Sequence, residues 1–265
     1  MPAGKIHKIT ILGAGRLATQ LGLAFSRKGL TMVQVYNRTP EKGIRLAKRI
    51  GASFTSDIRM ITPDADLYIL AVADSVVEEL ASGLRLKRKL VAHTSGTMRM
   101  DILEPVSKRI GVFYPVQTFS QNRSVDFRKI PLCIEGNSKE VEEQLAELAR
   151  KLTLNVHLLD SDRRRVLHLG AVFSSNFTNF IYAATEELLQ LHDIPFSLLE
   201  PLILQTAGNI KQGNPSQFQT GPAVRGDNKV LDKHREMLAD RPNYLEIYNL
   251  ITENIIKNNR RNGEL

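Results

Sequence analysis

The sequence predicts an α/β fold in which a doubly wound, mostly parallel sheet is followed by a smaller all-α domain. Apolar, strand-like runs alternate with helix-like segments through the first 159 residues, as in parallel sheets that are covered by helices on both faces. A glycine-rich turn joins the first strand to the first helix, and only helical patterns follow residue 160. We therefore expect two domains, residues 1–159 and 160–265.

The first domain opens with an apolar, β-branched run, KITILGAG at residues 8–15, and then a segment with Leu17, Leu21 and Phe25 at helical spacing. Thr39 is the expected cap of a second helix, with a proline next to it. The remaining pattern predicts helices at residues 74–84, capped by Asp74, and 139–152, and strands at residues 31–37, 66–72, 89–96, 110–116, 131–136 and 155–160. Strands that alternate with helices in this way form parallel βαβ units.

The second domain is expected to contain helices alone. Residues 163–193 are long enough for a single helix of about 45 Å at 1.5 Å per residue. Ser197 and Glu200 have the spacing of a capping box that opens another helix. Two more helices are predicted at residues 228–239 and 244–259.

Composition argues against several classes of protein. Cys133 is the single cysteine, so no disulfide framework is possible, and we expect a reducing, cytoplasmic environment. No apolar run has the length of a membrane span, so a membrane partner is not expected. Lys and Arg exceed Asp and Glu by 36 − 28 = 8. The basic clusters, at residues 85–89 and 163–165, lack interleaved aromatic residues, which favours an anionic cofactor and substrate over nucleic acid. No metal site is expected.

A dinucleotide-binding turn is predicted between the first strand and the first helix. The residues Gly13, Ala14, Gly15, Arg16, Leu17 and Ala18 match G-x-G-x-x-A. Gly13 permits the turn, Gly15 lets the backbone approach a pyrophosphate, and Ala18 lets the helix pack closely on the sheet. The alternative is an ordinary glycine-rich turn, but the strand and helix around it favour a Rossmann domain.

The end of the second strand predicts NADP rather than NAD. NAD enzymes usually have an acid there, which binds the ribose 2′-hydroxyl and would repel a 2′-phosphate. This chain has Asn37, Arg38 and Thr39 instead, and its next acid is Glu41. The Arg38 guanidinium can bind a phosphate, while Asn37 and Thr39 add neutral donors. The alternative is that Arg38 is simply a solvated charge.

Two further segments follow strands and should reach the carboxyl edge of the sheet, where ligands of this fold bind. Residues 71–74, which are Ala71, Val72, Ala73 and Asp74, are expected to line the dinucleotide. Residues 93–96, which are His93, Thr94, Ser95 and Gly96, are expected to approach the nicotinamide, with Thr94 on the cofactor and Gly96 on the substrate. For His93 the alternative is a plain loop histidine.

These motifs, together with YPVQTF at 114–119, SSN at 174–176 and TGPAVRGD at 220–227, resemble a family of NADP oxidoreductases. In that family a Rossmann domain is joined to a helical C-terminal domain of unknown function. The family is related to pyrroline-5-carboxylate reductase, ketopantoate reductase and 6-phosphogluconate dehydrogenase. The resemblance covers nearly the whole chain. It implies a helical domain that forms homodimers and lies against the cofactor crevice.

The chain departs from the related hydroxyacid dehydrogenases at two positions. Their long helix carries a lysine three residues before an asparagine, and that lysine transfers a proton. Asn176 matches the asparagine, but Phe173 stands at the lysine position. Tyr114 also stands where the family often has histidine. A lysine-based proton transfer is therefore not expected here.

Hydride transfer to C=O or C=N places negative charge on O or N, so the site needs a proton donor. The candidate catalytic residues are His93, Ser95, His168 and Asn176, and Tyr114 and Asn179 are expected to bind substrate. At 100° per residue, one helical stripe would hold His168, Val172, Ser175 and Asn179. Substrate, a neighbouring helix or a second subunit could satisfy these polar groups. The stripe alone does not choose among them.

The segment TGPAVRGD contains an Arg-Gly-Asp triplet, but a reducing environment argues against a role in adhesion. Its structural interpretation is a Gly-Pro turn and a helix cap at Asp227. Thr220, Gly221 and Arg225 are also candidates to bind an anionic substrate group. The sequence thus favours an NADP(H)-dependent oxidoreductase acting on a small anionic carbonyl or imine compound. The alternative is a sensor or partner protein that binds NADP(H) without turnover.

Overall fold

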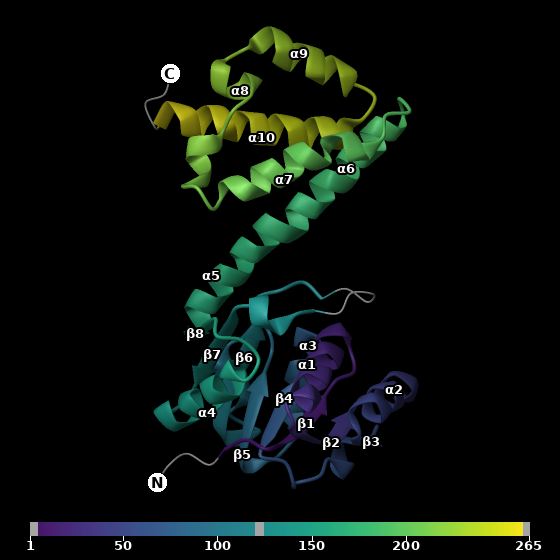
Figure 1. The fold of residues 1–265 in the computed structure, drawn as a ribbon, viewed down its shortest axis with the longest axis vertical. Coiled ribbons are helices and arrows are strands. Elements are labelled where there is room, and N and C mark those ends of the chain that lie inside the picture. Colours follow the sequence, from purple (N-terminus) through teal and green to yellow (C-terminus); the bar gives the residue numbers. More distant parts are fainter. Residues whose placement is uncertain (1–4, 120–124, 262–265) are drawn as a thin grey trace. The chain divides into compact units, whose positions relative to one another are not determined.

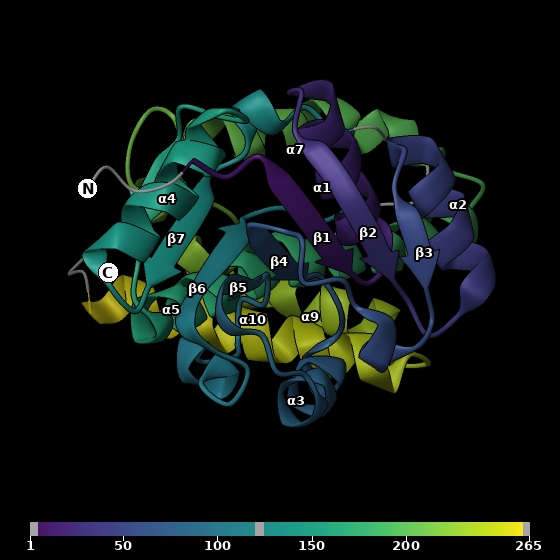
Figure 2. The same ribbon diagram turned by 90° about the horizontal axis from the view of Figure 1, so that it is seen from below.

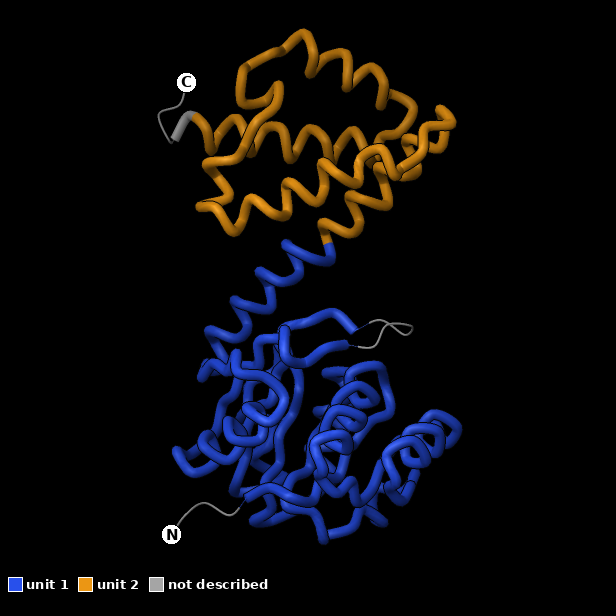
Figure 3. Tube along the Cα trace, viewed as in Figure 1, with its two compact units in different colours: residues 1–176 blue, residues 177–265 orange. Residues whose placement is uncertain are grey.

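A computed structural model describes residues 5–119 and 125–261 of the chain. The chain divides into two compact units, residues 1–176 and 177–265 (Figure 3). Every strand of the described residues belongs to the first unit, and the second contains only helices and turns. The helix that follows the last strand still belongs to the first unit. The units therefore divide further along the chain than the point, near residue 160, where strands stop alternating with helices.

The first unit is built on one sheet of eight strands with the order β3-β2-β1-β4-β5-β6-β7-β8 (Figure 1). All neighbouring strands are parallel except β6 and β7, which are antiparallel. This confirms the predicted mostly parallel, doubly wound sheet. The strands are β1 Lys8–Leu12, β2 Thr31–Tyr36, β3 Ser53–Thr55, β4 Leu67–Leu70, β5 Lys87–His93, β6 Ser107–Pro115, β7 Leu132–Gly136 and β8 Val156–Leu158. The three-residue edge strand β3 was not predicted, because it is too short to show periodicity.

Helices cover both faces of this sheet, as the apolar runs of the strands require. The helices of this unit are α1 Arg16–Arg27, α2 Pro40–Ile50, α3 Asp74–Gly83, α4 Lys139–Arg150 and α5 Ser161–Ala171. Figure 2 shows α1, α2 and α4 on one face of the sheet and α3 on the other. The larger core lies under α1, α2 and α4, where Phe25 meets the ring of Phe113 at 5.8 Å. The smaller core packs Val77 and Leu80 of α3 against the opposite face.

Helix starts agree with the sequence in part. Thr39 precedes α2 with Pro40 in its first turn, as predicted, but its side chain makes no capping hydrogen bond. The predicted cap at Asp74 is wrong, because Asp74 is already helical and Ala73 precedes the helix. An acid in the first turn still interacts favourably with the helix dipole.

The predicted long helix at residues 163–193 is interrupted. Helix α5 begins at Ser161, capped by Asp160, and is followed by a π-helical turn, Val172–Phe177, and by α6. A π-helical turn holds more residues than an α-helical turn. The single stripe predicted for His168, Val172 and Ser175 at 100° per residue is therefore wrong from the π-helical turn onward.

The second unit contains the helices α6 Thr178–Gln190, α7 Glu200–Asn209, α8 Pro222–Arg225, α9 Asn228–Met237 and α10 Pro242–Arg261. Asp227 caps α9 as predicted, since its carboxylate accepts from the Val230 amide. The capping box predicted at Ser197 is wrong, because residues Phe196–Leu199 form a 3₁₀ turn and α7 starts without a side-chain cap. Among the described residues no helix is both long and apolar enough to cross a membrane.

Candidate functional site

The turn between β1 and α1 is shaped by two glycines that meet different constraints. Gly13 has φ +116°, and a Cβ on it would lie 2.3 Å from the Ala71 carbonyl oxygen, so a side chain cannot be accommodated. A Cβ on Gly15 would meet nothing within 4 Å, which leaves open space beside the start of α1. The first turn of α1 holds no acidic residue. Its free amide groups and open approach therefore suit a phosphate group.

A crevice of about 520 Å³ extends from this turn along the carboxyl ends of β1, β2, β4 and β5. It brings together all but one of the residues predicted to bind cofactor, and two of those predicted to bind substrate, Gly96 and Tyr114. Its lining includes Gly13, Ala14, Gly15, Arg16, Leu17, Asn37, Arg38, Thr39, Ala71, Val72, Ala73, Asp74, Thr94, Ser95, Gly96, Tyr114 and His168. Ala18 is not in the lining, because it is fully buried in the core under α1, as its predicted packing role requires.

One end of the crevice is basic and lies after β2. Arg38 is exposed, and its guanidinium is 3.0 Å from the Glu79 carboxylate. An exposed pair of this kind contributes little to stability, so a phosphate can compete for the guanidinium. The side-chain amide of Asn37 donates to the Thr39 carbonyl oxygen at 2.7 Å and shapes the loop. Lys42, in the first turns of α2, also lines the crevice and was not predicted. It is four residues after Arg38 in the sequence, and this proximity is the feature that could have identified it as a second basic residue of the site.

His93 lies behind the crevice wall. It is fully buried and does not line the crevice. Its Nδ1 accepts from the Ser95 amide at 3.1 Å, so Nε2 carries the proton and faces the Arg99 carbonyl oxygen at 3.3 Å. Burial, assisted by the charge of Arg164, lowers the pKa of His93 to about 4. Because both ring nitrogens are engaged, its position does not support the predicted catalytic role.

The Ser95 hydroxyl is also engaged. Its oxygen accepts from the amides of Thr97 and Met98 at 3.1 and 3.0 Å. Thr97 Oγ1 donates its only proton to Asp74, so the Ser95 hydroxyl donates to Thr97 Oγ1 at 3.2 Å. Ser95 therefore shapes the loop and links it to the start of α3. Its hydroxyl has no proton left for a substrate in this arrangement.

Tyr114 and His168 form a hydrogen-bonded pair in the lining of the crevice. The Tyr114 hydroxyl lies 3.0 Å from His168 Nδ1, and the two rings meet edge to face at 6.0 Å. Gly96 lies directly against the imidazole, since a Cβ there would be 2.5 Å from His168 Nδ1. Burial raises the pKa of Tyr114, so the phenol stays protonated at neutral pH. Of the predicted polar residues, these two line the crevice with their side chains hydrogen-bonded to each other.

Cys133 lies across the antiparallel β6–β7 pair from Tyr114. It is almost fully buried, in a small apolar cluster with Val112. Burial raises the pKa of its thiol to about 11. Cys133 is therefore a packing residue behind the tyrosine.

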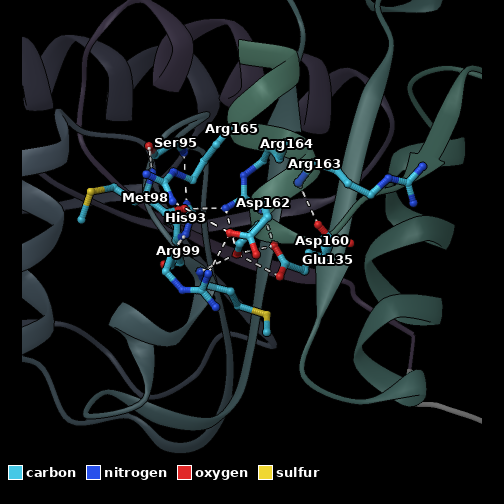
Figure 4. A network of polar contacts seen from close by, with 12 residues as sticks. His93, Ser95, Met98, Arg99, Glu135, Asp160, Asp162, Arg163, Arg164 and Arg165 are labelled. Atoms are coloured by element: carbon cyan, nitrogen blue, oxygen red, sulfur yellow. Dashed lines mark hydrogen bonds and ion pairs between the residues drawn. The ribbon is translucent and has the colours of Figure 1, made fainter. Parts of the chain in front are cut away.

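A buried ion pair holds the start of α5 against the sheet and the loop after β5 (Figure 4). Arg164 is fully buried, pairs with Glu135 of β7, and donates to the Met98 carbonyl. The Ser161 hydroxyl donates to the same Glu135 carboxylate at 3.0 Å and accepts from the Met100 amide at 3.0 Å. His168 lies one helical turn after Arg164, so this anchor fixes where the imidazole meets Tyr114.

The other predicted site residues lie outside this crevice lining. Asn176 is exposed in the π-helical turn, where the neighbouring Ser175 hydroxyl is 3.3 Å from that of Thr118. In the second unit, Asn179 and Arg225 are exposed on α6 and α8, and Gly221 has φ +112° just before α8. Thr220 lines an apolar cavity of about 380 Å³ within that unit. Their substrate-binding roles remain predictions.

The chain is similar to known families and structures over its length. A Rossmann-like domain matches residues 4–116, and the domain of unknown function DUF2520 matches residues 130–255. A "putative NADP oxidoreductase" from Bacteroides fragilis is 42% identical, with a TM-score of 0.88 over 96% of this chain and 98% of that one. No curated protein was found to match.

Two more distant structures share the fold. An imine reductase from Myxococcus stipitatus, in complex with NADP⁺, has 17% identity and a TM-score of 0.67 over 97% of this chain and 95% of that one. A pyrroline-5-carboxylate reductase from Coxiella burnetii has 20% identity and a TM-score of 0.58 over 97% of this chain and 98% of that one. Among the described residues of this chain, no cluster of three or more His, Cys, Asp or Glu residues could hold a metal ion.

The lowered pKa of His93 predicts a pH-dependent loss of stability. Between pH 6.5 and about 4 the unfolded chain binds a proton on His93 that the folded protein does not, so the free energy of unfolding falls as the pH falls. We expect His93 to account for a loss of about 1.5 kcal/mol between pH 6.5 and 5. Urea unfolding at both pH values measures it.

A His93→Gln variant should lose this part of the pH dependence, even if it is less stable at every pH. The control is His157→Gln, since His157 is exposed and bonded only locally to Asn155. This variant should keep the wild-type pH dependence. An unchanged pH dependence in His93→Gln would contradict the assignment.

Proposed function

This chain belongs to the family of the Bacteroides fragilis protein, in which a Rossmann-like domain is joined to DUF2520, and we propose that it is an NADP(H)-dependent oxidoreductase. Its substrate is a small, anionic imine or carbonyl compound. The observation that carries the proposal is the crevice itself. Its lining combines an open glycine turn, a basic end and the Tyr114–His168 pair. The imine reductase and pyrroline-5-carboxylate reductase with this fold make a C=N bond a candidate for reduction.

The residues present fit a phosphorylated dinucleotide. The space beside Gly15 would take the pyrophosphate at the start of α1. Arg38 and Lys42 would hold a 2′-phosphate, and the loop after β2 has no acid to repel it before Glu41. Bound NADPH would supply a hydride to the carbon of the C=N or C=O bond.

The Tyr114–His168 pair is proposed to supply the proton that the substrate nitrogen or oxygen gains. With the proton on His168 Nδ1 donated to the phenol oxygen, the phenol proton is free to be donated to substrate. When the His168 ring carries protons on both nitrogens, it can return the Nδ1 proton to the phenolate oxygen and remain a neutral imidazole, which solvent then reprotonates. The tyrosine thus donates, and the histidine both orients it and restores its proton.

The loop at residues 93–99 would exclude water and shape the substrate end. His93 and Ser95 hold its backbone, and Gly96 permits close contact with His168. We propose that Thr220, Gly221 and Arg225 of the second unit contribute to binding the substrate anion, with Asn176 and Asn179. The protein is proposed to act in the cytoplasm, which fits its single, buried cysteine.

The second candidate function is a catalytically silent NADP(H)-binding sensor or partner protein. Phe173, an exposed phenylalanine, favours it, because it stands where the lysine of the related dehydrogenases is expected. Turnover separates the two candidates. NADPH oxidation should be screened against cyclic imines and keto acids, and silence across the panel in protein that binds NADPH would favour the sensor.

Arg38 is predicted to select NADPH. Arg38→Glu places a carboxylate beside the 2′-phosphate, so we expect NADPH to bind about 10- to 100-fold more weakly while NADH changes little. Titration calorimetry with each cofactor measures this. Glu79→Gln is the matched control, because it releases Arg38 from its ion pair and should leave NADPH binding equal or tighter. Equal losses for both cofactors in Arg38→Glu would overturn the phosphate assignment.

Tyr114 is predicted to be the acid. Tyr114→Phe removes the hydroxyl and keeps the ring, so we expect kcat on an identified substrate to fall about 100-fold or more while the Kd for NADPH is unchanged. Tyr248→Phe is the control, since Tyr248 makes the same kind of bond, 2.8 Å to His234 Nδ1, within the second unit. Normal turnover in Tyr114→Phe would exclude the phenol as the acid.

We also propose that the second unit pairs with a second copy of the chain. Among its described residues, Ala223 and Leu231 are the only buried apolar side chains, whereas Leu202 and Leu204 of α7 are 58% and 64% exposed. Apolar side chains as exposed as these mark an interface. Light scattering should give a dimer for the wild type and a monomer for Leu202→Glu/Leu204→Glu. Lys211→Glu, an exposed change in the same unit, should stay dimeric. A wild-type monomer at micromolar concentration would contradict this proposal.

A further inference from the structure

A second, larger hollow lies at the opposite edge of the sheet from the cofactor crevice. This amino-edge groove has a volume of about 830 Å³ and lies where β1, β4, β5 and β6 begin. Six of its lining residues are cationic: Lys5, Arg85, Lys87, Arg88, Lys89 and Arg109. Asp66 and Glu140 are the acids that line it. The basic cluster at residues 85–89, which the oxidoreductase proposal does not use, therefore lines a cavity.

The two acids neutralise only part of this charge. The Asp66 carboxylate accepts from the backbone amides of His7 and Lys8, both at 2.9 Å. Glu140 pairs with Arg109 at 2.8 Å. Within the part of the chain that the structure describes, the other cations of the groove, Lys5, Lys87, Arg88, Lys89 and Arg85, make no ion pair with a carboxylate. Cations gathered without counter-charges repel one another and attract anions.

The backbone of the cluster is held in an unusual conformation. Lys87 has φ +51°, a left-handed conformation that residues with a side chain rarely adopt. A bulge follows, because the step from Lys87 to Leu90 on β5 faces a shorter step on β6. The buried Ser107 hydroxyl lies within hydrogen-bond distance of the Lys87 and Lys89 carbonyl oxygens and so fixes the bulge. Such bulges redirect side chains, and strained residues persist where neighbours hold them.

We propose that the amino-edge groove binds a small organic molecule that carries a di- or triphosphate group. Two or more phosphates match several cations that make no ion pair with a carboxylate of the described residues, and the exposed Arg88 guanidinium can bind a phosphate through two donors. Leu86 and Pro63 also line the groove, with the buried Ile6 beside them, and these apolar residues suit an organic moiety. The volume of the groove is within the range of ligand sites. The site is separate from the crevice and does not depend on the oxidoreductase proposal.

The probe for this site is inorganic tripolyphosphate, titrated into the full-length protein by calorimetry. We expect Arg88→Glu/Lys89→Glu to weaken its binding about tenfold or more, because two cations of the groove become anions. Lys28→Glu/Lys108→Glu has the same net charge but changes two exposed lysines outside the groove, and it should bind within about twofold of the wild type. Arg38→Glu/Lys42→Glu, which alters the cofactor crevice, should likewise retain this binding.

The proposal would be overturned by an absence of binding to the wild type, by an equal loss in the Lys28→Glu/Lys108→Glu variant, or by a loss found only in Arg38→Glu/Lys42→Glu. Tighter binding of a single-stranded RNA that tripolyphosphate fails to displace would overturn it too. The neutral variant Arg88→Gln/Lys89→Gln guards against misfolding. With an unchanged circular dichroism spectrum and melting temperature, it should show an intermediate loss, and full retention of binding in this folded variant would also overturn the proposal.

Discussion

The buried pair of Arg164 and Glu135 is the interaction on which the geometry of the crevice depends. Two charges without water are costly unless each is paired and hydrogen-bonded, and loss of one partner typically costs about 3–5 kcal/mol. Here the guanidinium also binds the Met98 carbonyl, and the carboxylate also accepts from Ser161 (Figure 4). Three segments that are distant in sequence are thereby locked together. His168 lies one turn further along α5, so the ion pair also fixes its position.

The fold could be predicted from the sequence because its signals are local. The glycine turn, the apolar strands and the helix cap at Asp227 each depend on neighbours within a few residues, and each is present in the structure. The π-helical turn at Val172–Phe177 could not be predicted, because no residue type marks an extra residue in a helical turn. The edge strand β3 was also not predicted, because a half-buried strand of only three residues shows no clear apolar pattern.

The candidate site was harder to predict, because its roles depend on burial and on contacts distant in sequence. His93 and Ser95 have suitable chemistry and lie at the expected edge, but their hydrogen bonds turn inward to support the loop. Tyr114 and His168 were both candidates, but they are 54 residues apart and the sequence did not predict that they pair. The contact between them is made by tertiary packing against Gly96, and no spacing rule encodes that. Lys42 was missed although it stands only four residues from Arg38.

The concealment of Cys133 has a practical consequence for work on this protein. Its thiol is the only one in the chain, and its raised pKa leaves almost no thiolate at neutral pH. Thiol reagents should therefore label the protein only when the β6–β7 pair opens. The single thiol behind Tyr114 thus serves as a native reporter of how often the β6–β7 wall of the crevice opens, with no engineered label required.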